Sequence, residues 1–271
     1  MSRARPDSAR AGRRRWLAAG LLQAALALGL PLRAQAAKPL RLAAASDLKF
    51  ALSLVLARFQ SETGQSVEAS FGSSGSFARQ IQQGLPVELF MSADEALVLQ
   101  LADAGLTRAT ASGPDRGVLY AVGRIALYVP SASTIPLDAG LQGLKARWSE
   151  VGKFAIANPE HAPYGRAARE ALQQLGLWEL VLPKLVLGEN ISQATQFVAT
   201  GAAQAGITAL SLALAPEVAQ NGRHLALPAR LHAPLRQRMV PLRSPTPAAL
   251  ALYAYLQGAA AREIFRRYGF A

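Results

Sequence analysis

Residues 40–59 read LRLAAASDLKFALSLVLARF, and this stretch changes from one apolar pattern to another. Leu40 to Ala45 is a short apolar run of the kind that forms a buried strand. Apolar residues then recur at helical spacing, at Leu48, Leu52, Val55 and Phe59. Ser46 or Asp47 stands where a helix cap is preferred. The stretch therefore predicts a strand that leads directly into a helix, which is the repeating unit of α/β folds.

The same alternation continues along the chain. Further strands are expected at 67–71, 89–91, 154–157, 185–187 and 205–208, and a helical pattern follows each of the first four. Two long segments, 118–129 and 222–245, are expected to cross between two lobes, and a helical pair over 246–268 closes the chain. The prediction is an α/β protein with two lobes of mostly parallel sheet, flanked by helices, and a ligand cleft between the lobes.

The first 36 residues have the three parts of a secretory signal peptide. Arg13, Arg14 and Arg15 precede an apolar run over 17–32, and Ala34-Gln35-Ala36 forms a small-x-small cleavage signal. The alternative, a membrane anchor, is disfavoured because the run is short for a spanning helix. We therefore expect export to the periplasm with cleavage after Ala36, through either the general or the twin-arginine route.

Composition excludes several classes of protein. Of the 271 residues, 51% are hydrophobic and 17% charged, which is typical of a globular chain with a sizeable core. The sequence has no cysteine, so disulfides, thiolate metal sites, cysteine nucleophiles and lipoprotein anchors are excluded. About half of the +12 charge excess lies in residues 1–36, and no basic run interleaved with aromatic residues follows. Nucleic acid is therefore not an expected partner.

The strand-to-helix junctions are rich in small residues and hydroxyls. A helix start presents free N–H groups and the positive end of the helix dipole, so several starts around one cleft would bind an anion without a cationic side chain. Each junction alone also reads as an ordinary N-cap. The junctions fall at 44–47, 72–76, 92–94, 163–165 and 189–192.

Catalytic patterns are weak. Gly72-Ser73-Ser74-Gly75-Ser76 lacks the final glycine of a nucleophile elbow. The three histidines show no metal-ligand spacing. Asp47 and Asp94 could pair as acid and base, but both stand in a first helical turn, where capping accounts for them. The sequence therefore favours a protein that is not an enzyme.

At these same residues the chain resembles the molybdate-binding periplasmic proteins of ABC transporters, over nearly all of the predicted mature chain. The resemblance is carried by the order and spacing of several motifs. They are Ala43-Ala44-Ala45-Ser46, Phe71-Gly72-Ser73-Ser74-Gly75-Ser76 with Ala78-Arg79-Gln80-Ile81, Leu89-Phe90-Met91-Ser92-Ala93-Asp94, Asn158-Pro159-Glu160-His161-Ala162-Pro163-Tyr164-Gly165 and Ile264-Phe265-Arg266-Arg267-Tyr268-Gly269-Phe270.

The resemblance implies a type II periplasmic-binding fold that closes around a bare tetrahedral dianion. Lobe I would comprise residues 37–119 and 238–271, and lobe II residues 120–237. The oxyanion would be held through its oxygens, with no direct ligand to the metal. Ser46 and Ser74 would donate hydroxyl and N–H groups. Ala93, Tyr164 and Ile191 would donate N–H groups. Matched position by position, the binding residues are Ala44, Ser46, Ser74, Ala93, Tyr164 and Ile191.

Two departures from the family pattern concern this site. Ala209 stands where many members carry the site tyrosine, and Tyr164 stands where those members have a small residue. We interpret this as a swap in which Tyr164 supplies the phenol from the opposite loop. Asp47 places a carboxylate beside a dianion, so it either turns outward or turns inward to accept a proton from an oxyanion such as phosphate.

The function that the resemblance implies is capture of molybdate or tungstate and delivery to an ABC transporter permease in the inner membrane. The protein would act as a monomer without a cofactor. One alternative is a binding protein for another oxyanion: sulfate, phosphate or a phosphonate. A second is an exported serine hydrolase using Ser46 or Ser74, and a third is the effector domain of a regulator.

Overall fold

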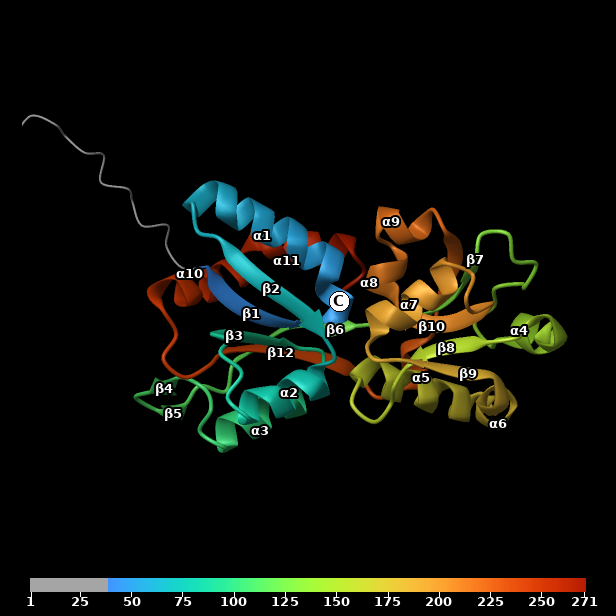
Figure 1. The fold of residues 1–271 in the computed structure, drawn as a ribbon, viewed down its shortest axis with the longest axis horizontal. Coiled ribbons are helices and arrows are strands. Elements are labelled where there is room, and N and C mark those ends of the chain that lie inside the picture. Colours follow the sequence, from blue (N-terminus) through green and yellow to red (C-terminus); the bar gives the residue numbers. More distant parts are fainter. Residues whose placement is uncertain (1–38) are drawn as a thin grey trace, which may run out of the picture. The chain divides into compact units, whose positions relative to one another are not determined.

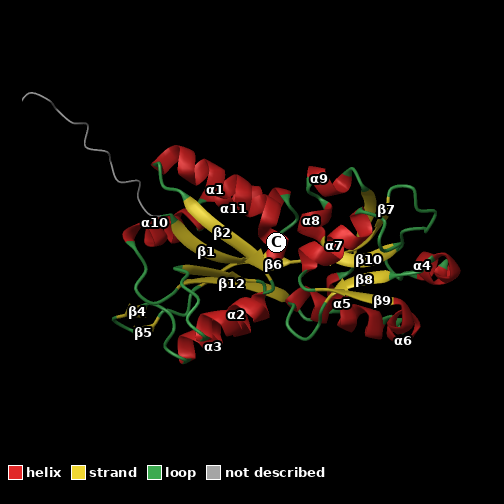
Figure 2. Ribbon diagram, viewed as in Figure 1, coloured by secondary structure: helices red, strands yellow, loops and turns green. Residues whose placement is uncertain are grey.

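The computed structural model describes residues 39–271, and its longer strands form two five-stranded sheets (Figure 1). The predicted signal peptide, residues 1–36, lies outside the described residues. Within them, no helix combines the length and apolar character that crossing a bilayer would need. Helices lie on both sides of each sheet (Figure 2), as the alternation of strands and helices predicts.

The first sheet has the strand order β2-β1-β3-β12-β6. β1 is parallel to β2 and β3, whereas β12 is antiparallel to β3 and β6. The strands are β1 (Leu40–Ala45), β2 (Val67–Gly72), β3 (Leu89–Ser92), β6 (Val118–Gly123) and β12 (Leu235–Pro241). Its helices are η1 (Ser46–Leu48), α1 (Lys49–Thr63), α2 (Ser74–Gln82), α3 (Glu95–Asp103), α10 (Pro247–Leu256) and α11 (Ala259–Arg267).

The second sheet has the order β11-β7-β10-β8-β9 and is also mixed. Its strands are β7 (Ile125–Pro130), β8 (Phe154–Ala157), β9 (Leu185–Gly188), β10 (Ala205–Ala209) and β11 (Gly222–Ala226). The helices here are α4 (Gln142–Ala146), η2 (Trp148–Glu150), α5 (Pro163–Gln174), α6 (Trp178–Val181), η3 (Leu182–Lys184), α7 (Ile191–Ala199), α8 (Leu210–Ala213), α9 (Pro216–Ala219) and η4 (Ala229–Leu231). A small hairpin, β4 (Ala109–Thr110) and β5 (Gly113–Pro114), stands apart.

Two segments carry the chain between the sheets. β6 passes into β7 through Arg124 alone, and β11 is followed by β12 in the first sheet. The expected crossings at 118–129 and 222–245 are thereby confirmed. The crossing strands make every antiparallel pairing of the two large sheets, which is why these sheets are mixed. The predicted lobe divisions at 119/120 and 237/238 fall inside β6 and β12, two strands that pair within the first sheet.

The opening stretch folds as its pattern predicts. β1 is buried at every position except Arg41, because neighbouring strands and helices cover its faces. Leu52, Val55 and Phe59 of α1 are likewise buried. Each large apolar side chain removed from water contributes about 1.5–3 kcal/mol. α1 ends at Gly64, whose φ of 72° lies in the left-handed region that favours glycine.

The parallel strands bring several helix starts to one edge of each sheet. Ala45 at the end of β1 pairs in register with Gly72 at the end of β2, and η1 and α2 begin directly beyond them. In the second sheet, β8 and β9 are parallel and are followed by α5 and α7. Since ligands of α/β folds bind beyond the carboxyl ends of strands, these junctions are where a site is expected.

Candidate functional site

A small cavity lies where the starts of η1, α2, α5 and α7 meet. Its volume is about 10 Å³. Sites for drug-sized ligands enclose roughly 300–1,000 Å³, so this cavity suits a small ion. None of its lining residues is a lysine, arginine or histidine. They are Ala45, Ser46, Asp47, Gly72, Ser73, Ser74, Ala93, Ala162, Pro163, Tyr164 and Ile191.

The cavity brings together most of the residues that the sequence selects. The predicted binding residues that line it are Ser46, Ser74, Ala93, Tyr164 and Ile191. Ala44 does not line the cavity: it lies fully buried within β1, and its neighbour Ala45 takes that place.

Three α-helices point their first turns at this cavity. Ser74 is the first residue of α2, Ile191 the first of α7 and Tyr164 the second of α5, directly after Pro163. The N–H groups of these positions have no partner within their own helices. The positive ends of the three helix dipoles add to these donors. The arrangement is therefore suited to hold an anion through backbone donors.

The two serine hydroxyls are prepared to donate. Ser74 Oγ accepts a hydrogen bond of 2.9 Å from the N–H of Ala93, and Ser46 Oγ accepts one of 3.3 Å from the N–H of Ser192. A hydroxyl has one hydrogen and two lone pairs, so each serine keeps its hydrogen for a further acceptor. The N–H of Ala93, predicted as a donor to the ligand, is directed at Ser74 in this structure.

A buried polar network lies beside the cavity, centred on Asp47. The Tyr164 hydroxyl donates to Asp47 Oδ2 at 2.9 Å, and Gln237 Nε2 donates to the same oxygen at 2.7 Å. The Tyr120 hydroxyl donates to Gln237 Oε1 at 2.7 Å. Gly123 permits this packing, because a Cβ there would overlap the Tyr164 hydroxyl. The network therefore joins α5 to strands and turns of the first sheet.

Burial controls protonation in this network. Burial raises the pKa of the Asp47 carboxyl to about 6, and the hydrogen bonds from Gln237 and Tyr164 oppose that rise only in part. Burial and the charge of Asp47 hold the pKa of Tyr164 well above its ordinary value. The phenol consequently stays protonated and acts as a donor.

Capping explains only one of the two aspartates. Asp94 caps α3, accepting a hydrogen bond of 2.9 Å from the N–H of Ala96. The capping prediction is wrong for Asp47, since η1 has no side-chain cap and the Asp47 side chain is only 1% exposed. Asp47 turns inward because Tyr164 and Gln237 supply donors that a capping position on the surface would not offer.

Contacts around the cavity link elements of the two sheets. The His161 carbonyl oxygen accepts from the Ser73 hydroxyl at 2.6 Å and from the N–H of Gly75 at 3.1 Å. Arg166 of α5 pairs with Asp94 at the start of α3. Ser211 of α8 donates to the main-chain oxygen of Asp47 at 2.8 Å. Donors from both sheets thus surround one small space.

Comparisons with known proteins show the family of this chain. The family model for bacterial extracellular solute-binding proteins matches residues 40–271. The chain is 37% identical to the molybdate-binding protein ModA of Azotobacter vinelandii, over 92% of this chain and 96% of that one. It is 38% identical to ModA of Rhodobacter capsulatus, over 94% and 96%. The chain belongs to the ModA family of bacterial extracellular solute-binding proteins.

Solved structures confirm the fold expected of this family. The periplasmic molybdate-binding protein of Azotobacter vinelandii superposes with a TM-score of 0.76 at 28% identity, covering 86% of this chain and 98% of that one. The sulfate-binding protein SubI of Mycobacterium tuberculosis superposes with a TM-score of 0.67 at 16% identity, covering 86% of each chain. The protein therefore has the α/β type II periplasmic-binding fold.

The hydroxyl of Tyr164 has a hydrogen-bond partner that the sequence did not predict. Tyr164 lines the cavity, but its hydroxyl hydrogen is directed at Asp47. Ala209, where many family members carry their site tyrosine, is fully buried at the end of β10. The swap stays a prediction. In this structure the hydroxyl hydrogen of Tyr164 is donated to Asp47 rather than directed at the position of an anion.

Sequence reasoning missed two residues of the Asp47 network. Gln237 is fully buried on β12 between Arg236 and Arg238, which both pair with Glu95. The available signal was a neutral amide between two charged residues in a strand. Because neighbouring residues of a strand face opposite sides, arginines on the solvent-facing side at 236 and 238 would place the side chain of Gln237 on the buried face. Tyr120 lies within an apolar run, where an aromatic residue reads as core, so its role had no signal in the sequence.

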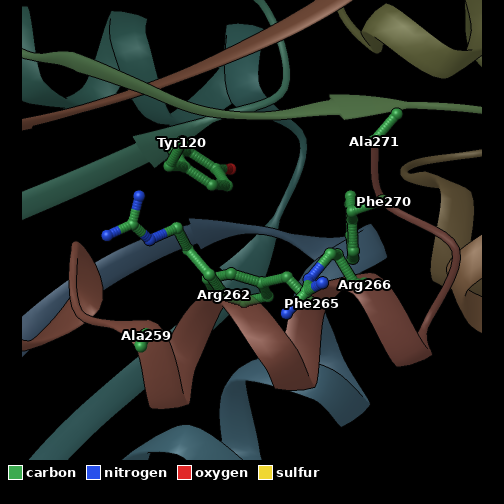
Figure 3. Close-up of a pocket in the computed structure, with 7 residues that line it drawn as sticks. All are labelled: Tyr120, Ala259, Arg262, Phe265, Arg266, Phe270 and Ala271. Atoms are coloured by element: carbon green, nitrogen blue, oxygen red, sulfur yellow. The ribbon is translucent and has the colours of Figure 1, made fainter.

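A larger hollow lies away from these helix starts, beside α11 (Figure 3). Its volume is about 400 Å³, and Tyr120 faces Phe265 across it with Arg262 and Arg266 nearby. None of the predicted binding residues lines this hollow. We assign the functional site to the smaller cavity because that cavity alone of the two gathers helix starts and serine hydroxyls.

Proposed function

We propose that the protein is a periplasmic solute-binding protein that captures molybdate or tungstate and delivers it to an ABC permease in the inner membrane. The observation that carries the proposal is the cavity itself. N–H groups of three helix starts and the hydroxyls of Ser46 and Ser74 surround a small space lined by no cationic side chain. The names of the ModA relatives supply the ligand class.

The mechanism is reversible capture without bond making. The oxygens of the dianion accept hydrogen bonds, and no residue ligates the metal directly. Ser46 and Ser74 follow strands of the first sheet, while Tyr164 and Ile191 follow strands of the second. A ligand that needs donors from both sides stabilises the closed arrangement, which then docks on the permease as a monomer. Cavity size would favour molybdate and tungstate over the smaller sulfate.

A serine hydrolase is the rival from another class, and its geometry is poor. His161 Nδ1 lies 3.0 Å from Ser73 Oγ, but the Ser73 hydroxyl hydrogen is donated to the His161 carbonyl oxygen at 2.6 Å. Within the described residues, Ser46 and Ser74 have no histidine as a hydrogen-bond partner. Serine nucleophiles need an adjacent base. A fluorophosphonate probe should therefore leave the protein unlabelled, and labelling of Ser46 or Ser74 would support the hydrolase.

Calorimetric titration tests the proposed ligand. We expect one-to-one binding of molybdate and of tungstate, and no heat from sulfate or phosphate. Ser74→Ala should weaken molybdate binding at least tenfold, since a lost hydrogen bond to a charged group costs about 1.5–3 kcal/mol. Ser53→Ala, at an exposed position on α1, is the matched control and should bind as the wild type does. Heat from sulfate or phosphate alone would assign another oxyanion instead.

A further inference from the structure

One oxygen of the Asp47 network has no partner. Asp47 Oδ2 accepts hydrogen bonds from Tyr164 and Gln237, whereas Oδ1 is buried and has no hydrogen-bond partner among residues 39–271. Asp47 also lines the small cavity together with Ser46 and Ser74. Since Oδ2 is already occupied by two donors, Oδ1 is the oxygen of Asp47 that remains for a ligand.

Among the described residues, no cationic side chain pairs with this carboxyl group. The titratable groups that face it are Tyr164 of α5 and Tyr120 of β6, and both stay neutral because burial holds the pKa of each phenol well above its ordinary value. The hydrogen bond from Tyr164 lowers the pKa of Asp47 but adds no positive charge. On β12, Gln237 is neutral, and its neighbours Arg236 and Arg238 pair with Glu95.

The elements that pack on η1 offer no cation either. The helices α7 and α8 contain no titratable residue, and Ser211 of α8 donates only to the main-chain oxygen of Asp47. On α1 and β2, the nearest charged residues, Lys49 and Glu68, are exposed. An ionised Asp47 would therefore meet a bound dianion without a cationic side chain to offset the repulsion.

Protonation of Asp47 would give Oδ1 a hydrogen-bond partner and would remove the negative charge that repels the dianion. A carboxylic acid carries one O–H donor and keeps its other oxygen as an acceptor. With the proton on Oδ1, Oδ2 still accepts from Tyr164 and Gln237, and Oδ1 gains an acceptor in the anion. Burial already raises the pKa of Asp47 to about 6, so the proton is gained readily near neutral pH, and a dianion beside the carboxyl raises that pKa further.

We propose that Asp47 is a specificity-determining residue of the oxyanion site, which binds the anion as a neutral carboxylic acid donating from Oδ1. One proton enters from solvent with each dianion and returns to solvent when the anion leaves. The site then consists of donors only. A fully deprotonated dianion such as molybdate fits this protonated site, whereas hydrogen phosphate brings a proton that finds an acceptor only when Asp47 is ionised. This inference rests on the proposed function and deepens it.

The test counts protons during molybdate binding. The purified protein is titrated with molybdate at pH 8 in two buffers of different ionisation enthalpy, and the difference in heat gives the protons taken up. We expect uptake of about one proton per molybdate, and an affinity that falls about tenfold per pH unit above the Asp47 pKa. Asp47→Asn keeps the shape and an N–H donor. It should show no proton uptake and a nearly constant affinity over the same range, after thermal melting confirms that it folds.

The variant also controls for the ligand, because any proton carried by the anion itself would appear equally with Asp47→Asn. Molybdate binding without proton uptake by the wild type, or the same uptake by both proteins, would overturn the role of Asp47 and leave the proposed function intact. Preferential binding of phosphate without proton uptake would instead make Asp47 an acceptor, and would overturn this inference. If none of the four oxyanions binds either protein at any pH, the proposed function fails together with the inference.

Discussion

At the scale of single residues, Asp47 shows how a chain can hold a carboxyl group beside an anion site. Its neighbours provide hydrogen bonds but no positive charge, and its side chain is almost fully buried. Desolvation then favours the neutral form. The same residue therefore affects stability as well as ligand choice, and the two effects can be measured separately.

The pH dependence of stability should carry the signature of Asp47. Its pKa of about 6 in the folded protein lies above the ordinary 3.8, so the folded state holds this proton more tightly. Its contribution is fully present below about pH 3.8 and is lost as the pH rises through about 6. The loss is roughly 3 kcal/mol at 1.36 kcal/mol per pKa unit.

Urea unfolding of the wild type and of Asp47→Asn across pH 4–7 measures this contribution. The free energy of unfolding of the wild type relative to the variant should fall by that amount over the window. Subtracting the variant removes the carboxylates with lowered pKa values, such as Glu95, whose contributions change in the opposite direction. A difference that stays constant with pH would show that Asp47 is not buried as described.

Removing the Tyr164 hydroxyl should also destabilise the protein. Tyr164→Phe leaves Asp47 with Gln237 as its remaining side-chain donor, and an under-satisfied buried group costs about 1–3 kcal/mol. Urea unfolding at pH 7 gives the change in the free energy of unfolding. Tyr253→Phe, a partly buried tyrosine of α10, is the control and should change stability by less than about 0.5 kcal/mol. Equal effects of the two substitutions would contradict the network.

At the scale of secondary-structure elements, the site depends on how closely the start of α2 approaches the loop before α5. Gly75 donates to the His161 carbonyl oxygen, and a Cβ at Gly75 would overlap that same oxygen. Neither backbone can move without displacing its helix start. A glycine here therefore serves close approach rather than an unusual backbone angle.

Gly75→Ala should weaken anion binding while the fold is retained. The added methyl group pushes α2 and the His161 loop apart, so Ser74 and Tyr164 can no longer contact one small ion together. Calorimetry should show molybdate affinity reduced at least tenfold, with circular dichroism unchanged. Gly140→Ala is the matched control, because the nearest atom to a Cβ there lies at 3.5 Å. Unchanged affinity of Gly75→Ala would mean that this contact is not needed for binding.

At the scale of the whole molecule, the binding groups are divided between two sheets. The first sheet leads into η1 and α2, and the second leads into α5 and α7. The chain crosses between the sheets at Arg124 and again between β11 and β12. An anion that contacts both sides therefore links them and adds its binding free energy to the stability of the folded state.

Saturation with molybdate should raise the free energy of unfolding by a calculable amount. At a free concentration of about 100 times Kd, binding to the folded state alone contributes about 2.7 kcal/mol. Urea unfolding with and without molybdate measures the change, and sulfate at the same concentration is the control that should leave stability unchanged. An equal rise with sulfate would reveal a general salt effect instead of a specific site.

The sequence by itself determined the class of fold and most of the cavity lining. Strand and helix patterns are local, and hydroxyls and small residues mark helix starts, so the junctions that hold Ser46, Ser74, Tyr164 and Ile191 could be located from the chain alone. The choice of these residues as binding residues came from the family resemblance. The direction of the Asp47 side chain was decided only by tertiary structure. Its partners Tyr164 and Gln237 lie 117 and 190 residues away along the chain. A local pattern therefore predicts a cap at Asp47, whereas long-range packing supplies the donors that turn its carboxyl group inward.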